Sequence, residues 1–490
     1  MKKMNVLWLL MLMVNSLFAQ LNNPPGLNLI RTEDLEKDLY ALADAHFNGR
    51  SAGTLDELKA AAWMADQYRK IGLQPAGDDG TYFQYFTLWR NQIADQSSIQ
   101  INQTNFALWK DAAIAQMANI SINAPIVYLG NAPDIDTNTV DVKDKVVAIV
   151  ANAKGINLNV SLPTWRYSRY IFIKYGQPLI KRGATAIIFI ADGVAENAWN
   201  DAAENFKRGL YDIDGGPNAH ITTTVPVIWL HANAAKELEG NTATIKANLI
   251  VEKYPYPSVN IVGKVIGTDA ALKAEYVLYS GHIDAHGIRN VIGNDSIYHG
   301  ADDNGSVDVA MLADARAFVK YPPKRSVLFL IHGAEERGLL GSRYFAANPT
   351  VPVKNIVAVL NGDMIGRNNT DSAALLGIIP PHRNSTALVN FALAANKEGP
   401  RFIIDSSWDD VKHIEGWYFR SDHLPYARLG IPAIMYTSLL HADYHTPQDN
   451  AENINYPKLK KMADWLYRTG WKVANAASRP ATDANFKLER

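Results

Sequence analysis

The 490-residue chain contains no cysteine, which excludes disulfide bonds, a thiol nucleophile and cysteine-ligated metal sites. It also has no excess of charge of one sign, because 48 lysines and arginines face 49 aspartates and glutamates. Without a basic excess, neither nucleic acid nor anionic lipid is expected as a partner. Any metal site in this chain must therefore use histidine, aspartate and glutamate side chains.

Long apolar runs are also scarce, and the first of them lies at the N-terminus. Lys2 and Lys3 precede an apolar run at Val6–Val14, and a small residue, Ala19, follows. This order predicts a secretory signal peptide over residues 1–19. No later run reaches about 18 apolar residues, so we expect a periplasmic or secreted protein with no membrane attachment after signal removal.

The composition, 48% apolar and 20% charged, is typical of a globular protein with a large core. After residue 256, apolar runs alternate with helical stretches such as 307–318 and 385–395. Four of the runs are typical of buried parallel strands: 276–279, 327–331, 356–360 and 433–436. The pattern predicts an α/β fold with a mixed, mainly parallel sheet between layers of helices.

The region before residue 256 differs, because short β-like runs separated by Gly, Asn and Asp fill residues 97–255. We interpret it as a β-rich insert, and the stretch Tyr254–Pro257 is a candidate exit linker. The tail is polar and is expected to fray. The predicted organisation has five parts: signal peptide 1–19, N-terminal part of the main domain 20–96, insert 97–255, main domain 256–475 and tail 476–490.

The four predicted strands share one property, which is that each is followed by histidine or carboxylate side chains. These are His282 and Asp284, then Glu335 and Glu336, then Asp363, then His445. A further loop carries Asp302 and Asp303. Open α/β sheets bind ligands at the carboxyl ends of their strands, so we expect these groups to meet.

Imidazoles and carboxylates together suit zinc, and two ions usually share a bridging carboxylate. The Asp302–Asp303 loop could supply that bridge. Each group alone has an ordinary explanation, such as a helix cap at Asp363 or a solvated helix start at Glu335. Their recurrence at successive strand ends, with nine of the twelve histidines between His282 and His445, favours a metal centre.

Five sequence blocks carry a more specific signal. They are Ser280-Gly281-His282-x-Asp284, Gly300-Ala301-x-Asp303-Asn304-x-Ser306, Glu335-Glu336-x-Gly338-Leu339-x-Gly341-Ser342, Asn361-x-Asp363-Met364 and His445-Thr446-Pro447-x-Asp449. In this order they resemble the di-zinc aminopeptidase family, which includes bacterial leucyl-type aminopeptidases and glutamate carboxypeptidase. Residues 97–255 resemble the protease-associated insert of some members. The resemblance implies the zinc exopeptidase fold.

The resemblance also implies a set of ligands for two zinc ions. His282 and Asp363 would hold one ion, and Glu336 and His445 would hold the second. Asp303 would bridge the two, and its peptide bond to the next residue is often cis in the family.

The same resemblance implies the catalytic groups. Glu335 would act as the general base on a metal-bridging water, and Tyr444 would stabilise the oxyanion. Asp284 would orient His282 by contacting the ring nitrogen of His282 that does not bind the metal. The family often has Asp-His-Leu-Gly where this chain has Asp284-Ala285-His286-Gly287, and we expect this departure to leave the ligands untouched.

The implied function is a secreted zinc-dependent aminopeptidase that releases N-terminal residues from peptides. Three alternatives stay open: a carboxypeptidase-like exopeptidase, a glutaminyl-cyclase-like acyltransferase and a non-enzymatic receptor-like binding module. Arginines near the blocks (Arg343, Arg367 and Arg420) keep the carboxypeptidase reading open. The complete ligand set counts against the last two alternatives.

Overall fold

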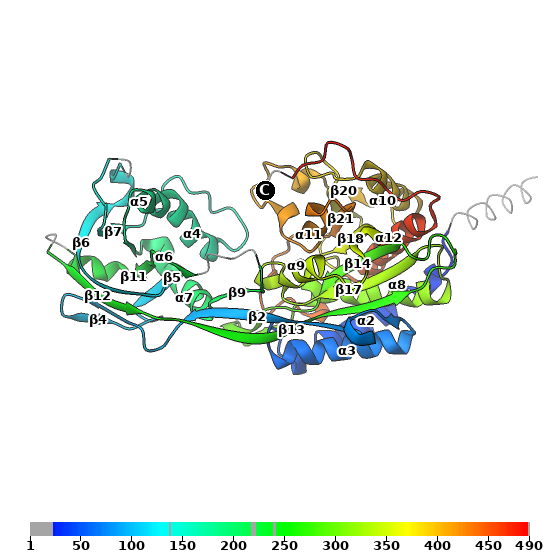
Figure 1. Ribbon diagram of the computed structural model, residues 1–490, viewed down its shortest axis with the longest axis horizontal. Coiled ribbons are helices and arrows are strands. Elements are labelled where there is room, and N and C mark those ends of the chain that lie inside the picture. Colours follow the sequence, from blue (N-terminus) through cyan, green and yellow to red (C-terminus); the bar gives the residue numbers. More distant parts are fainter. Residues whose placement is uncertain (1–22, 137–138, 217–221, 239–241, 489–490) are drawn as a thin grey trace, which may run out of the picture. The chain divides into compact units, whose positions relative to one another are not determined.

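The computed structural model describes residues 23–136, 139–216, 222–238 and 242–488. The predicted signal peptide, residues 1–19, lies outside this range. The described chain divides into two compact units (Figure 1). The first contains the described residues up to Phe86 and from Pro257 onward, and the second runs from Thr87 to Tyr256.

The first unit is built on a mixed sheet in which the central strands are parallel. The strand order is β20, β19, β21, β18, β14, β17, β13, β2. Strands β21, β18, β14 and β17 all run in one direction, whereas β19 is antiparallel to β21 and β13 is antiparallel to β17. The bounds are β20 Ile403–Ile404, β19 Ser372–Leu376, β21 Ala433–Thr437, β18 Ile356–Gly362, β14 Tyr276–His282, β17 Ser326–His332, β13 Val251–Val265 and β2 Phe83–Ile93, with the short β1 Gln74–Pro75 paired to β13.

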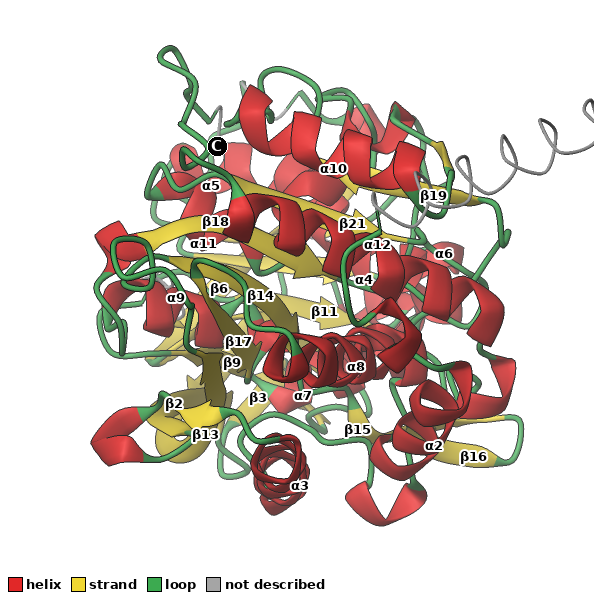
Figure 2. Ribbon diagram, turned by 90° about the vertical axis from the view of Figure 1, so that its right-hand side faces the viewer, coloured by secondary structure: helices red, strands yellow, loops and turns green. Residues whose placement is uncertain are grey.

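Helices cover both faces of this sheet. Successive side chains of β14 point to opposite faces, so Val277 and Tyr279 pack into one apolar core and Leu278 into another. Figure 2 shows α8 and α12 against the first face, and α9 and α11 contribute to the opposite core. The helix bounds are α2 Thr32–Leu42, α3 Leu55–Ile71, α8 Ser306–Lys320, α9 Leu340–Ala347, α10 Thr386–Glu398, α11 His423–Arg428 and α12 Tyr456–Asn475. The predicted mixed sheet between helical layers is confirmed.

Helix α3 illustrates how local sequence sets these elements. The Thr54 hydroxyl accepts hydrogen bonds from the backbone N–H groups of Asp56 and Glu57, which caps the first turn. The helix ends at Gly72, which adopts a φ of 97° that favours glycine. Ala60, Ala61 and Met64 share the buried face, so the helix lies along the core.

The second unit is a mixed α/β module with its own cores. Parallel strands β6, β7, β8 and β11 form its centre, and antiparallel strands flank them. The strand order is β10 Thr222–Thr223, β5 Ala112–Ala118, β11 Val227–Leu230, β8 Ala186–Ile190, β7 Val146–Val150, β6 Ile120–Asn131, β12 Thr244–Leu249, β3 Ser98–Ile101 and β4 Thr104–Phe106. The helices are α4 Pro163–Ile171, α5 Gln177–Lys181, α6 Gly193–Asn197 and α7 Trp199–Arg208, and β9 Leu210–Asp212 pairs with Trp89–Asn91 of β2. The unit is therefore more helical than the sequence patterns predicted.

Two expectations about connecting segments were wrong. Tyr254–Pro257 contains the unit boundary, but it lies inside the long strand β13 instead of forming a loop. The tail does not fray before residue 488, because Asp483 accepts hydrogen bonds from the backbone and hydroxyl of Thr386, and the Ser385 hydroxyl donates to Ala481 O. Across the described residues, the helices are too short or too polar to cross a membrane.

Candidate metal centre

The four parallel strands bring their carboxyl ends to one edge of the sheet. The register pairs His282, the last residue of β14, with His332 at the end of β17, and Gly362 of β18 with Tyr436 of β21. Glu335 and Asp363 follow within three residues of the ends of β17 and β18. Parallel pairing thus places these side chains together, as expected for an α/β ligand site.

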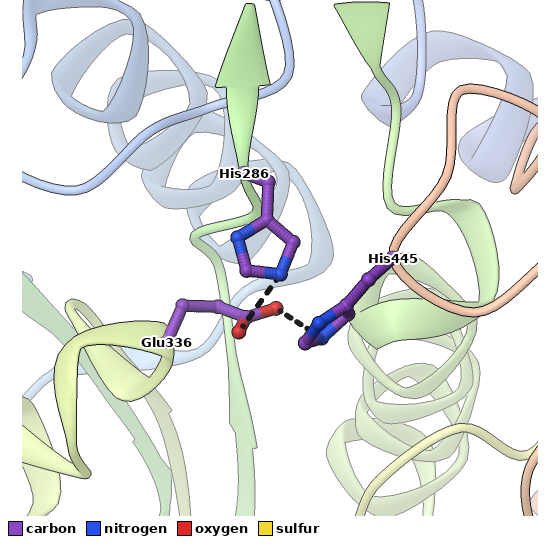
Figure 3. A group of neighbouring side chains, drawn as sticks. All are labelled: His286, Glu336 and His445. Atoms are coloured by element: carbon purple, nitrogen blue, oxygen red, sulfur yellow. Dashed lines mark ion pairs between the residues drawn. The ribbon is translucent and has the colours of Figure 1, made fainter. Parts of the chain in front are cut away.

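The side chains at this edge form two groups of possible metal ligands. One consists of His282, Glu335 and Asp363, and the other of His286, Glu336 and His445 (Figure 3). Within each group the ligand atoms lie within 4.8 Å of one another. His282 is 1% exposed and Asp363 6%, so the first group lies deep at the sheet edge.

Asp303 lies between the two groups and contacts both. Its Oδ1 is 3.3 Å from Nε2 of His282, and its Oδ2 is 3.1 Å from Nε2 of His445. One carboxylate therefore faces an imidazole of each group with a different oxygen. This is the arrangement that a bridging ligand requires.

The loop that carries Asp303 is held from two sides. Asp449 accepts the backbone N–H groups of Asp302 (2.9 Å) and Asp303 (3.0 Å). The Asn304 side chain donates to Gly362 O and accepts from Met364 N. The Asp303–Asn304 peptide bond is cis, as the resemblance led us to expect. The carboxylate of Asp302 instead accepts the N–H of Gly366 and faces His441. Asp303 is therefore the residue of this loop that is placed to bridge two ions.

Asp284 acts on the site mainly through backbone groups. Its carboxylate accepts the N–H of Glu335 at 2.9 Å and of Glu336 at 3.2 Å. The ring nitrogen Nδ1 of His282 is 3.1 Å from the Asp284 carbonyl oxygen but 3.8 Å from its carboxylate. Orientation of His282 thus comes from the carbonyl, since the carboxylate is occupied by the turn at Glu335–Arg337.

Tyr444 lies beside the second group, with its ring stacked on that of His445 at a centroid distance of 3.7 Å. Its hydroxyl accepts a hydrogen bond of 2.8 Å from Arg420, which leaves the O–H proton available for donation. Burial raises the pKa of Tyr444 well above its usual value of 10, so the hydroxyl stays protonated.

His286 is the site residue that sequence reasoning missed. The expectation that its segment does not touch a ligand was wrong, because Nε2 of His286 is 3.2 Å from Oε2 of Glu336. Its ring centroid is 3.9 Å from that of His445. The signal in the sequence was an additional histidine two residues after Asp284, but its side-chain direction depends on the turn at Gly287, where φ is 74°.

The buried carboxylates of the site repel one another, so a bound cation would stabilise their charged forms. Burial and the neighbouring Asp303 raise the pKa of Asp363 to about 7. Burial likewise raises the pKa of Glu335 well above its usual value, with Glu336 and Asp422 adding to the effect. Against the effect of burial, Glu336 and Asp303 raise the pKa of His445 to about 9.

The donor set fits divalent cations. Nε2 of His282 and Oε1 of Glu336 are buried and make no hydrogen bond within the described part of the chain. Such atoms carry a desolvation cost that ligation would offset. Imidazole nitrogens and carboxylate oxygens are the ligands that zinc accepts in the absence of cysteine.

Three comparisons with known proteins bear on this site. Residues 260–469 match Peptidase family M28. A probable zinc metalloprotease of Pyrenophora tritici-repentis is 26% identical over 300 residues, 51% of this chain and 67% of that protein. The aminopeptidase YwaD of Bacillus subtilis is 27% identical over 190 residues, 37% of this chain and 40% of its own length.

Solved structures show the same fold. The structure of an aminopeptidase from Aneurinibacillus sp. strain AM-1 has a TM-score of 0.59 and 19% identity, covering 94% of this chain and 98% of that one. A zinc aminopeptidase from Bacillus subtilis, BSAP, has a TM-score of 0.57 and 18% identity, with coverage of 94% and 99%. These likenesses confirm the predicted fold class.

Proposed function

We propose that this chain is a zinc-dependent aminopeptidase that removes N-terminal residues from peptides, as the match of residues 260–469 to Peptidase family M28 supports. The observation that carries the proposal is the carboxylate of Asp303, which faces His282 with one oxygen and His445 with the other. That geometry supports a pair of ions sharing one bridging ligand.

The residues that would hold the ions come from both groups and from the carboxylate between them. His282 and Asp363 would hold one zinc, Glu336 and His445 the second, and Asp303 both. When bound, the ions supply a Lewis acid and lower the pKa of water from about 15.7 to about 7. Both histidines must be neutral to ligate, so zinc affinity falls as the pH is lowered.

Glu335 would move the proton of the reaction. Glu335 is 9% exposed, and its Oε2 lies 3.8 Å from Nε2 of His282, in the first group. From this position it takes a proton from the attacking water and passes it to the leaving amine. Tyr444 donates its O–H to the oxygen on which negative charge develops.

The arginines near the site support an aminopeptidase over a carboxypeptidase. Arg367 forms an ion pair with Asp443, and Arg420 forms one of 2.9 Å with Glu415. Nε of Arg343 donates to the carbonyl oxygen of Gly338. A guanidinium that is already paired is a poor anchor for a substrate carboxylate, because the existing partner must first be displaced.

The test combines metal analysis with a substrate panel. The purified protein should contain two zinc ions per chain, and treatment with a chelator should abolish hydrolysis until zinc is restored. Aminoacyl p-nitroanilides with a free α-amine should be cleaved, and N-acetylated counterparts should not. Equal cleavage of free and blocked substrates, or full activity in metal-free protein, would contradict the proposal.

We propose in addition that the protein is exported. The basic, apolar and small segments of residues 1–19 support this, and the mature chain would begin at Gln20.

A further inference from the structure

We propose that His286 is a direct ligand of the ion held by Glu336 and His445. This inference rests on the proposed function, since it assigns an additional donor to one of its two metal sites. The sequence blocks that predicted the other ligands do not contain His286. Its assignment comes from where the structure places the ring.

The distances around Glu336 match the edges of a zinc coordination tetrahedron. Ligand bonds of about 2.0–2.1 Å place neighbouring tetrahedral ligands roughly 3.3–3.4 Å apart. Oε2 of Glu336 is 3.2 Å from Nε2 of His286, and Oε1 is 3.3 Å from Nε2 of His445 (Figure 3). The His445–Asp303 contact, 3.1 Å, is similar to these edges.

The two histidines meet the carboxylate in equivalent ways. Each presents Nε2 to a different oxygen of Glu336, and the two rings are nearly perpendicular, at 78°. His286 is 9% exposed. A buried imidazole whose ligand atom lies within 4.8 Å of those of the proposed ligands Glu336 and His445 is placed to act as a third donor.

The backbone around His286 is held by two residues from the N-terminal part of the chain. Gly287 N donates to Gly49 O at 2.9 Å, and the fully buried Arg50 donates to the carbonyl oxygens of Ile283 and Gly300. Arg50 therefore ties the segment before His286 to the loop that carries Asp303. These hydrogen bonds fix the backbone on both sides of His286.

The additional ligand makes the two metal sites unequal. With His286, the second site would have four protein donors, His286, Glu336, His445 and the shared Asp303, the number that a tetrahedral zinc site takes. The first site has His282, Asp363 and Asp303. We therefore expect the second ion to bind more tightly and to leave last during chelation, with the open position for water at the first ion.

Zinc binding of the purified protein tests this directly. Apo-protein is titrated with zinc against a competing chelator for wild type, His286→Ala, His286→Gln and a control, His46→Ala, whose imidazole is a surface group. Wild type and control should show one tight and one weaker site. Both His286 variants should lose about 100-fold or more at the tight site, because even partners outside the ligand shell are worth 10–100-fold.

The glutamine variant separates ligation from positioning. Glutamine retains an N–H donor for Glu336 but is a poor zinc ligand, so restoration of wild-type affinity in His286→Gln would show a positioning role and overturn the proposal. Unchanged affinity in His286→Ala would also overturn it. X-ray absorption of the two-zinc protein provides a second measurement, with three imidazoles expected per two ions in wild type and two in His286→Gln.

The outcomes also separate this inference from the proposed function. If the wild-type protein binds two zinc ions and cleaves free aminoacyl substrates, but the His286 variants have unchanged zinc affinity, only the ligand assignment is refuted. A wild-type protein that binds no zinc refutes both. Near-wild-type thermal unfolding of the apo variants shows that a loss of affinity is not a loss of folding.

Discussion

Glu335 and Glu336 are adjacent in the chain, yet their carboxylates belong to different groups of the metal centre. Asp284 accepts both of their N–H groups and so fixes the turn that separates them. We expect Glu335→Gln to retain both zinc ions and to lose roughly 10²–10⁴-fold in kcat, because a general base is removed. Zinc content and steady-state kinetics check this.

Glu336→Gln is the matched control for that prediction. It changes the same functional group one residue away, but it should release the ion held with His445. If Glu335→Gln loses as much zinc as Glu336→Gln, then Glu335 is a ligand and the roles proposed for the pair are wrong.

Tyr444 allows a second test at a single atom. Tyr444→Phe keeps the ring stacked on His445 and removes only the O–H. Loss of one donor to a developing oxyanion typically lowers kcat by roughly 10²–10³-fold. We expect a fall of this size in kcat with little change in KM. Tyr40→Phe, at an exposed position of α2, serves as control. An equal fall in kcat for both variants would contradict the role proposed for Tyr444.

Sequence reasoning at this scale worked where a side chain follows directly from a strand end. His282 and Asp363 are at or next to the ends of β14 and β18, so parallel pairing alone brings them together. His286 could not be predicted in the same way. Its position depends on contacts with Gly49 and Arg50, more than 200 residues earlier in the chain.

At the scale of elements, buried strands were the most predictable features. Residues 327–331 and 356–360 were expected as strands and lie within β17 (Ser326–His332) and β18 (Ile356–Gly362), because short, apolar runs pack as central strands. β13 was harder, since it continues through Pro255 and Pro257, which ordinarily interrupt a strand.

Helix α8 carries a buried carboxyl group, Asp314, that the proposed reaction does not use. Asp314 is fully buried, and its two carboxylate oxygens make no hydrogen bond within the described residues. Burial, assisted by Asp464 and opposed by Lys460, raises its pKa well above the usual value. The folded protein therefore holds a proton that the unfolded chain releases above about pH 4.

The sign of the resulting pH dependence follows from this difference. Above the unfolded pKa, the unfolded chain binds fewer protons, so the free energy of unfolding falls as the pH rises, by up to about 1.4 kcal/mol per unit until the folded pKa is reached. Asp314→Asn removes this term. Denaturant unfolding should show that its stability relative to wild type improves between pH 5 and pH 8, whereas the exposed Asp66→Asn tracks wild type. A constant difference would contradict the prediction.

At the scale of the whole molecule, the insert contributes no residue to the proposed metal centre. Every proposed ligand and catalytic group lies in the first unit, and the second unit has its own two apolar cores. The chain passes into the second unit within β2 and returns within β13, and these two strands are neighbours in the sheet. Ala94 N donates to Ile250 O at 2.9 Å. The two ends of the segment 94–250 therefore lie one hydrogen bond apart.

We therefore expect that residues 94–250 can be replaced by an Asn-Gly turn, the connection that suits two adjacent antiparallel strands. The shortened protein should fold, bind two zinc ions and cleave small aminoacyl substrates, because its sheet and its ligands are retained. Zinc analysis and thermal unfolding, with and without a chelator, measure this. Wild-type zinc content combined with lost hydrolysis would place substrate binding in the insert, and a protein that folds without binding zinc would show that the metal centre depends on it.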